Sequence, residues 1–453
     1  MSLTTETTQS TGLIDVAIIG AGGAGFLAAI GAARSGARTV LFERMKTPAK
    51  KVVISGGGRC NFSNTLDARK FVRLFGDRNS TKLGNALRSL SNEDVIELLK
   101  AHGVEGQLEK NYRLYTKSGR GADVVAALSA ELQKSGGSME LRARILTIKK
   151  ATSETGESFF ELAGTFGETE GVRRAKTIVI STGGLSYPVT GSTGDGYTWA
   201  REFGHKTTSL RAALVGLVAA EQWTRALQGL AWPDAQVSLW ADAKLQGKPF
   251  CVERAEILFT HFGISGPAIL DASNAFVAST LKQATLTIDY FPDETREALD
   301  ARLLERFREF PNRTAARAMD GLMPARMLEH CEAQLGADAQ TSVCRLPKTA
   351  RLKLLDLLKS TRLTITGTRG IEFGEVTAGG IEWDEIDSAT MESKCAPGIF
   401  FAGEILDLAG RCGGFNLQAA FSTGYLAGQC AARKVLEKIN SADESPAKRD
   451  AQS

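Results

Sequence analysis

A cluster of glycines near the start of the chain has the spacing of a nucleotide-binding turn. Residues Gly20 to Gly25 read Gly-Ala-Gly-Gly-Ala-Gly, which fits the pattern G-x-G-x-x-G. In such a turn the first glycine permits a tight bend, the second lets the backbone approach a pyrophosphate, and the third lets a helix pack closely on a strand. Glu43 follows eighteen residues after Gly25, where a carboxylate can accept hydrogen bonds from both hydroxyls of an adenosine ribose. The spacing predicts a site for an adenine dinucleotide.

Later segments favour FAD over NAD as that dinucleotide. The apolar run 398–402 is followed by Gly403-Glu404, and residues 413–416, Gly-Gly-Phe-Asn, then open a helical stretch. These segments resemble FAD enzymes of the glutathione-reductase type, in which such a late strand brings an acid to the ribityl or pyrophosphate side of FAD. The next helix N-terminus faces the flavin, where negative charge develops on reduction. The strand-like run 177–181, Thr-Ile-Val-Ile-Ser, followed by Thr182-Gly183, is typical of the crossing strand in such flavoproteins, with Ser181 in place of the usual Ala. We expect FAD to be bound non-covalently and NAD(P)H to be its reductant. Because the chain has no second G-x-G-x-x-G, it has no dedicated nicotinamide domain, and NAD(P)H is expected to bind only transiently.

Two side chains are candidates for acid–base chemistry at the flavin. Cys60 lies in a glycine-rich loop beside Arg59 and after Lys50 and Lys51, a basic setting that can lower the pKa of a thiol. It could give a proton to a substrate carbon as hydride arrives from the flavin. The alternative is that this loop only cradles FAD and that Cys60 is a small buried residue. His261, in a segment rich in Gly and Pro, could act as a general acid or orient the substrate, or it could form a structural hydrogen bond.

The elements that carry these residues follow a strand–helix–strand order. The apolar runs 13–19 and 39–43 predict two buried parallel strands, and the Ala-rich stretch 24–35 predicts the helix between them. Residues 46–64 read as a loop with three consecutive glycines. Further helices are expected at 80–90, 92–102, 121–136 and 417–439, and further strands at 139–149, 158–163, 176–181 and 398–402.

The middle of the chain differs in character and indicates an insertion. Strand-like runs predict an antiparallel module at 214–219, 236–241, 256–260, 284–290 and 363–368. The stretch 293–360 is rich in Leu, Arg, Ala and Glu and is expected to be helical.

Several long motifs occur together in this chain. They are Ile54–Asn64, the glycine-rich stretch 183–196, Phe259–Pro267, and the C-terminal segments 403–407 and 413–418. In these motifs and their order the chain resembles the BaiN/YhiN-like flavoproteins, also labelled aminoacetone-oxidase-like, a family of NAD(P)/FAD-dependent oxidoreductases.

The resemblance implies an α/β fold in three parts. These are a Rossmann-type FAD-binding domain, an inserted antiparallel β-barrel-like module, and a helical subdomain within the insertion. The expected boundaries are 13–208 and 374–437 for FAD binding, 209–292 and 361–373 for the β module, and 293–360 for the helical subdomain, with disordered tails at 1–12 and 438–453.

The motifs and the resemblance together give the expected FAD contacts. These are Gly20, Ala21, Gly22, Ala24, Gly25, Glu43, Arg44, Lys51, Gly57, Gly58, Arg59, Cys60, Asn61, Ile145, Thr182, Gly183, Gly403, Glu404, Gly414, Phe415 and Asn416. No metal is expected, because the seven cysteines are scattered without metal-ligand spacing.

Composition argues against a membrane protein and leaves the partner open. The 453 residues are 43% hydrophobic and 23% charged, and no apolar run approaches the ~20 residues that span a bilayer. The polar N-terminus lacks the apolar core of a signal peptide, and the scattered cysteines suit a reducing compartment, so we expect a cytoplasmic protein. The formal charge is +4, with basic stretches at 69–88, 110–120 and 345–353. These are either solvated faces or a docking surface for RNA.

Three functions stay open at this point. The resemblance implies an NAD(P)H-dependent reductase of an activated C=C bond, whose substrate is a steroid-like enone or a uridine of ribosomal RNA. It also allows an oxidase of a small amine of the aminoacetone type. A non-catalytic FAD-binding sensor or scaffold is the third reading. Reduction of the flavin by NADH or NADPH would separate the reductase from the scaffold.

Overall fold

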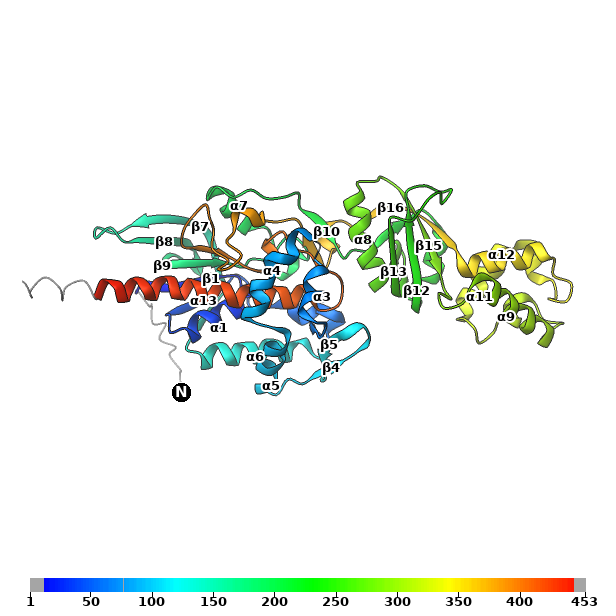
Figure 1. The fold of residues 1–453 in the computed structure, drawn as a ribbon, viewed down its shortest axis with the longest axis horizontal. Helices are drawn as coiled ribbons and strands as arrows, with labels where there is room; N and C mark the ends of the chain where they lie inside the picture. The colour runs from blue at the N-terminus through cyan, green and yellow to red at the C-terminus, as the bar shows by residue number, and fades with distance from the viewer. Residues whose placement is uncertain (1–11, 76, 444–453) are drawn as a thin grey trace, which may run out of the picture. The chain divides into compact units, whose positions relative to one another are not determined.

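The computed structural model describes residues 12–75 and 77–443, which fold as two compact units (Figure 1). The first unit is split in sequence: it takes the chain up to Arg211 and again from Val376 onward. The second, Ala212–Glu375, is continuous and is called the inserted unit below. The expected α/β class with an inserted antiparallel barrel is confirmed.

The first unit is built on a mixed sheet in the order β6-β2-β1-β9-β8-β7, with β18 also paired to β9. Its centre is parallel: β2, β9 and β18 all run in the direction of their neighbours β1 or β9. These central strands are almost wholly apolar because both faces of the sheet are covered. The strands span Ile14–Ile19 (β1), Thr39–Glu43 (β2), Ser138–Leu141 (β6), Ala143–Thr152 (β7), Ser158–Phe166 (β8), Thr169–Ile180 (β9) and Ile399–Phe401 (β18).

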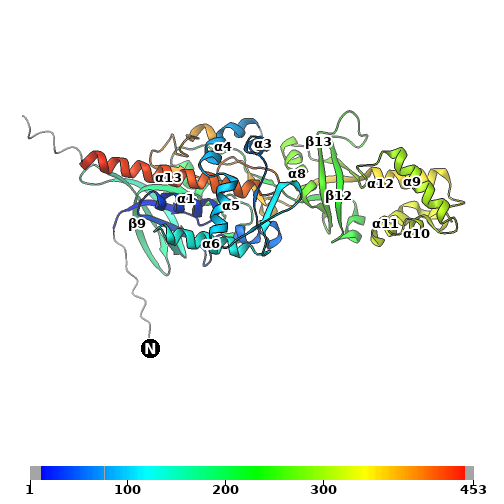
Figure 2. The same ribbon diagram turned by 60° about the horizontal axis from the view of Figure 1, so that its bottom comes forward.

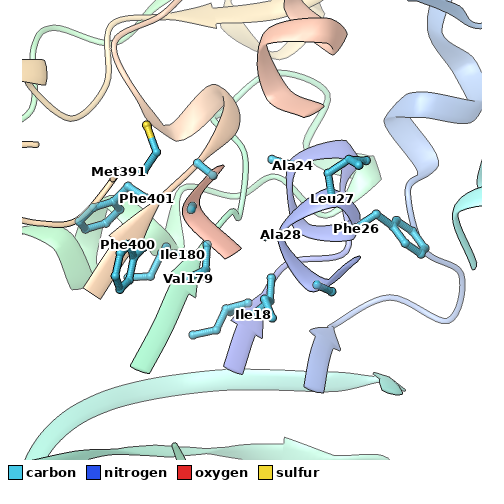
Figure 3. Packing of buried hydrophobic residues seen from close by; sticks show 14 of the residues in the cluster. Ile18, Ala24, Phe26, Leu27, Ala28, Val179, Ile180, Met391, Phe400 and Phe401 are labelled. Atoms are coloured by element: carbon cyan, nitrogen blue, oxygen red, sulfur yellow. The ribbon is translucent and has the colours of Figure 1, made fainter. Parts of the chain in front are cut away.

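Strand β9 joins two kinds of pairing. Its first half is antiparallel to β8, from Thr169 to Ala175, and its last residues pair in parallel with β1 and β18. Figure 3 shows Ile18, Val179 and Phe400 on these three neighbouring strands within one apolar core. A strand from the start, one from the middle and one from the end of the sequence therefore share one sheet.

Two long helices lie side by side in Figures 1 and 2: α1 (Gly23–Arg34) and α13 (Phe415–Asp443). Their close approach depends on glycine. A Cβ on Gly424 would lie 2.1 Å from the carbonyl oxygen of Ala24, and a Cβ on Gly428 would lie 1.9 Å from that of Ala28. No side chain fits at either position, so the sequence brings the two helix backbones into direct contact.

The segment 46–64, expected to be a loop, contains regular structure. It holds the short helix α2 (Lys50–Ile54), a 3-10 turn at Ser55–Gly58 and strand β3 (Asn61–Asn64). Strand β3 pairs with β5, which also pairs with β4, in a second small sheet. The other elements of this part are β4 (Gly106–Leu108), β5 (Arg113–Thr116), α3 (Ala68–Arg73), α4 (Asp77–Ser89), α5 (Asn92–Ala101), α6 (Gly121–Lys134) and α7 (Asp195–Glu202).

The inserted unit contains a closed antiparallel barrel in the order β11-β14-β13-β12-β15-β16. Strand β13 is longer than expected, and β14 and helix α8 were not expected at all. A helical group lies between β15 and β16, within 293–360. The elements are β11 (Leu217–Ala219), β12 (Ala231–Trp240), β13 (Cys251–Thr260), β14 (Gly263–Ser265), α8 (Pro267–Ser279), β15 (Ala284–Asp289), α9 (Arg296–Glu309), α10 (Ala315–Ala318), α11 (Ala325–Leu335), α12 (Lys348–Lys359) and β16 (Thr361–Thr368).

The last helix extends to Asp443, so residues 438–443 are helical where a disordered tail was expected. The rest of the expected tails, 1–11 and 444–453, lies outside the described residues. Across the described residues, every helix is too short or too polar to span a bilayer.

Candidate cofactor and active site

The turn between β1 and α1 has the open backbone that a pyrophosphate needs. Gly20 has φ +100°, and a Cβ on Gly25 would lie 1.8 Å from the carbonyl oxygen of Gly20, so both positions require glycine. A Cβ on Gly22, in contrast, would meet nothing within 4 Å. Gly22 is the N-cap of α1 and offers no side chain to the first N–H groups of the helix. The helix N-terminus is therefore free to bind a phosphate.

Glu43 stands at the end of β2 and is held by two backbone N–H groups. Its Oε2 accepts from Ala21 and its Oε1 from Met45, each at 2.8 Å. The side chain is nearly buried, and this burial raises the pKa of Glu43 above its ordinary value, while the two N–H donors oppose the rise. Glu43 thus ties the glycine turn to the end of β2, a structural task in addition to the ribose contact expected from the sequence.

A loop covers the same end of β2. Arg44 donates from Nη1 to Oγ1 of Thr193 at 2.5 Å and to the carboxylate of Asp195 at 2.7 Å. A Cβ on Gly191 would lie 3.8 Å from Oε1 of Glu43. Ile145, another expected contact, is buried on β7. The glycine-rich stretch 183–196 therefore lies against the predicted adenosine end of the site.

Strand β9, the crossing strand predicted from the sequence, leads directly into Ser181 and Thr182, which lie beside the glycine turn. Ser181 donates from Oγ to the carbonyl of Gly20 at 3.0 Å, which fixes the crossing against the glycine turn. Oγ1 of Thr182 is buried and has no hydrogen-bond partner among the described residues. Gly183 follows in the left-handed region, at φ +74°. The open turn at Gly22 and the unpaired Thr182 hydroxyl are features that a bound dinucleotide would complete, so these residues fit FAD.

Lys51 and Glu404 form one half-buried polar network with groups from distant segments. Lys51 donates from Nζ to Glu404 at 3.0 Å and to Oγ of Ser186 at 2.8 Å. Glu404 also accepts from the hydroxyl of Ser186 at 2.8 Å and from the backbone N–H of Thr377 at 3.0 Å. The network joins α2, the crossing loop and the turn after β18, where Gly403 has φ +78°. Contact of Lys51 and Glu404 with FAD remains a prediction.

The glycine-rich loop after α2 presents bare backbone. Gly57 and Gly58 have φ +69° and +89°, and a Cβ on either would meet nothing within 4 Å. Arg59 does not point back into this space: its Nη1 pairs with Glu109 at 2.6 Å, and its guanidinium lies 4.0 Å from the ring centre of Tyr115. The loop can cradle a flat or anionic ligand, while Arg59 binds the neighbouring strand.

The expectation that basic neighbours lower the pKa of Cys60 is wrong. The thiol is fully buried, and this burial raises its pKa to about 11, opposed only by a hydrogen bond with Ser55. Two of the three cations expected to act on it, Arg59 and Lys51, pair with carboxylates elsewhere. Cys60 is therefore a neutral thiol at neutral pH, held at φ +54°.

The C-terminal turn is bonded to strand β3. With its side-chain amide oriented to satisfy its neighbours, Asn61 accepts from the N–H of Gly414 at 3.0 Å. Asn64 donates to the carbonyl of Gly413 at 2.9 Å. The Asn416 side chain, an expected FAD contact, closes its own turn by bonding both backbone groups of Gly410, and its contact with FAD stays a prediction. These bonds tie the turn into α13 to strand β3, and Phe415 beside the turn is buried.

The expected FAD contacts all belong to the first unit, whereas His261 belongs to the inserted unit. His261 is exposed in the turn between β13 and β14 of the inserted unit, with its ring edge-on to Phe262. Its catalytic role stays a prediction. Thr377 was missed by the sequence analysis: its buried Oγ1 accepts from the N–H groups of Leu185 and Ser186. The pair Gly379-Gly380 just after it was the available signal.

Comparison with known proteins adds to this geometry. Residues 14–430 match the family described as HI0933-like protein Rossmann domain. The ribosomal RNA dihydrouridine synthase of Escherichia coli K12 is 32% identical over 415 residues, which are 92% of this chain and 97% of that protein. The 3-dehydro-bile acid delta(4,6)-reductase of Clostridium scindens is 29% identical over 431 residues, 92% of this chain and 99% of that protein.

Among solved structures, the 3-ketosteroid-delta4-(5alpha)-dehydrogenase of Rhodococcus jostii RHA1 has a TM-score of 0.52 at 15% identity. The match covers 94% of this chain and 99% of that protein. At this identity the likeness concerns the fold alone.

Proposed function

The chain belongs to the HI0933-like Rossmann family of FAD-dependent oxidoreductases, and from this premise we propose that it uses NAD(P)H to reduce a C=C bond conjugated to a carbonyl group. We propose uridine in ribosomal RNA as the substrate.

The observation that carries this proposal is that two relatives, each matching over 92% of the chain, are named for unlike substrates and one type of reaction. Dihydrouridine differs from uridine by two hydrogens across a double bond next to a carbonyl. A delta(4,6)-reductase of a 3-dehydro bile acid acts on double bonds conjugated to a ketone. The relative named for ribosomal RNA has the higher identity of the two, which favours uridine as substrate.

The reaction needs three contributions, two of which belong to this chain. FAD, when bound, supplies the hydride that adds to the β carbon, and NAD(P)H is oxidised to restore it. The uncapped N-terminus of α1 and Glu43 would hold the pyrophosphate and the ribose. A protein group must then give a proton to the α carbon, so that two hydrogens are added in all.

Cys60 is suited to this last task in one respect. Because its pKa is raised to about 11, the thiol keeps its proton at neutral pH and is available as an acid. The opposite arrangement, a thiolate in a basic loop, would have to gain a proton before it could give one. Complete burial means that Cys60 can act only if the substrate reaches the inner side of the glycine loop.

The two half-reactions test the role of Cys60. Cys60→Ala should retain FAD and its reduction by NAD(P)H but lose about 10²–10⁴-fold in product formation, the usual effect of removing a general acid. Cys60→Ser should retain part of the activity. If the alanine variant forms product at the wild-type rate per bound FAD, Cys60 is only part of the cradle and His261 becomes the next candidate.

The substrate is tested with ribosomal RNA nucleosides from cells lacking the gene and from the parent strain. Dihydrouridine should disappear from one position, and the purified enzyme with NADPH should restore a mass gain of about 2 Da at that position. Unchanged RNA, together with reduction of a steroid enone, would move the substrate to the second class. Oxygen uptake with aminoacetone would support the oxidase, and absence of flavin reduction would support a scaffold.

A further inference from the structure

The hairpin formed by β4 and β5, labelled in Figure 1, has a strained tip. Two successive residues that carry side chains, Asn111 at φ +60° and Tyr112 at φ +61°, occupy the left-handed region. Glycine adopts this conformation without cost, whereas other residues rarely do. Strain of this kind persists only where the surroundings hold it, and it is concentrated at functional sites.

Specific hydrogen bonds hold the strained tip in place. The backbone N–H of Thr65 donates to the carbonyl of Tyr112 at 2.9 Å, and Nδ2 of Asn64 donates to the carbonyl of Asn111 at 3.1 Å. The same Asn64 amide donates to the carbonyl of Gly413, in the turn that leads into α13. One side chain therefore fixes the hairpin tip and the predicted flavin-facing turn in a single arrangement.

The strained tip carries an exposed aromatic ring, that of Tyr112. Tyr112 is 57% exposed and Leu108, on the same hairpin, is 60% exposed. Lys110, also exposed, forms no ion pair within the described part of the chain. A hydrophobic core does not require such a ring, and burial cannot explain why the backbone is strained to present it.

Arg113, the residue after the tip, packs against the C-terminal turn. Nε of Arg113 is buried and has no partner among the described residues. This nitrogen lies 3.4 Å from the position that a Cβ on Gly413 would occupy, so the arginine side chain packs directly against the backbone of the turn. A guanidinium in this position can donate to a phosphate or to a base carbonyl.

We propose that this hairpin binds single-stranded RNA next to the reacting uridine. The ring of Tyr112 is the platform on which an unpaired base next to the reacting uridine stacks, and the side chains of Lys110 and Arg113 contact the RNA backbone or bases. Exposed aromatic rings interleaved with cations are the usual means of holding single strands. The proposal rests on RNA being the substrate, as argued above, and adds the residues that recognise it.

Binding of a fluorescein-labelled oligouridine, measured by anisotropy, tests the platform. Tyr112→Ala should weaken binding about 5- to 100-fold, the range expected for one lost base stack, and Tyr112→Trp should restore it. Lys110→Ala should reduce the salt dependence, with a slope smaller by about 0.7. Val172→Ala, which removes an exposed apolar side chain from β9, is the matched control and should bind as wild type.

A glycine variant separates recognition from structure. Tyr112→Gly should unfold at the same or a higher temperature than Tyr112→Ala, because glycine removes the left-handed strain, yet it should bind oligouridine as weakly. A side chain that only supported the hairpin would lower stability in both variants and leave binding per folded molecule unchanged.

The platform and the proposed function fail differently. If Tyr112→Ala binds oligouridine as tightly as wild type, or if the wild type does not bind it at all, the platform is wrong. If wild type binds and the variant does not, the platform stands. Reduction of the RNA, read separately by its gain in mass, then decides the function.

Discussion

Replacing Glu43 should affect folding and FAD binding to different extents. The carboxylate is 8% exposed and accepts two backbone N–H groups, from Ala21 and Met45. Glu43→Ala leaves both donors unpaired, the Ala21 N–H buried and the Met45 N–H partly buried, at a cost of about 1–3 kcal/mol for the first and less for the second. We therefore expect the apoprotein to lose about 1–5 kcal/mol of unfolding free energy. Glu43→Gln keeps one acceptor oxygen and should lose about half as much.

The affinity for FAD measures the second role expected of Glu43, its contact with the ribose. A ribose hydroxyl bonded to a charged group contributes about 1.5–3 kcal/mol, so Glu43→Gln should raise the Kd for FAD about 10- to 100-fold. Since burial raises the pKa of Glu43, its contribution to folding is largest below the ordinary value of 4.5 and is lost as the pH rises through the raised pKa. FAD affinity should change in the opposite direction, because the ribose hydroxyls need the ionised form.

The measurement is urea unfolding of FAD-free protein, followed by titration with FAD. Bound FAD adds its own stabilisation, so unfolding must be measured without it. If Glu43→Ala unfolds at the wild-type urea concentration, the two N–H groups do not depend on this carboxylate. If Glu43→Gln binds FAD as wild type does, Glu43 is not at the ribose.

Four further substitutions probe the same unit. Gly22→Ala should leave apoprotein stability within about 0.5 kcal/mol of wild type but weaken FAD binding at least about tenfold, since a Cβ there meets no protein atom; equal affinity would place the pyrophosphate elsewhere. Gly428→Ala should lower the free energy of unfolding by about 2 kcal/mol or more, because its Cβ would lie 1.9 Å from the carbonyl oxygen of Ala28. Gly84→Ala, in an open stretch of α4, should raise the free energy of unfolding by up to about 1 kcal/mol. Thermal unfolding that ranks the two variants the other way would refute the packing argument. Burial lowers the pKa of His205, so its contribution to stability is complete above pH 6.5 and is lost as the pH falls towards the lowered pKa; His205→Gln should flatten this part of the pH–stability curve, and an unchanged slope would assign the acid sensitivity to another group.

The FAD half of the fold could be predicted because its signals are local. The glycine turn, the carboxylate at the end of β2 and the apolar runs each fit within a few residues. The structure of 50–64 could not be predicted in this way, because β3 becomes a strand only by pairing with β5. The sign of the Cys60 pKa shift was wrong for a related reason. Sequence proximity to Arg59 and Lys51 says nothing about where those cations point, and Glu109 and Glu404 bind them.

Thr377 shows the same limit at the site itself. Apart from the glycine pair that follows it, this threonine has no recognisable pattern, and its importance comes from donors that lie far from it in sequence. The inserted barrel was predicted in outline but not in detail, since β14 has three residues and no period that could reveal it.

Because the first unit is split in sequence, its two parts are synthesised at different times. The ribosome releases Gly20–Gly25 and β2 early, but β18 and α13, which complete the sheet and cover α1, are synthesised only after the whole of 212–375. The inserted unit is continuous and can fold while the first unit still waits for its last strand and helix. The FAD contacts predicted at 403–416 are synthesised only near the end, and a chain cut short before Phe415 would leave the small residues of α1 uncovered. Premature termination should therefore yield a substrate for chaperones and proteases, with no partly active enzyme.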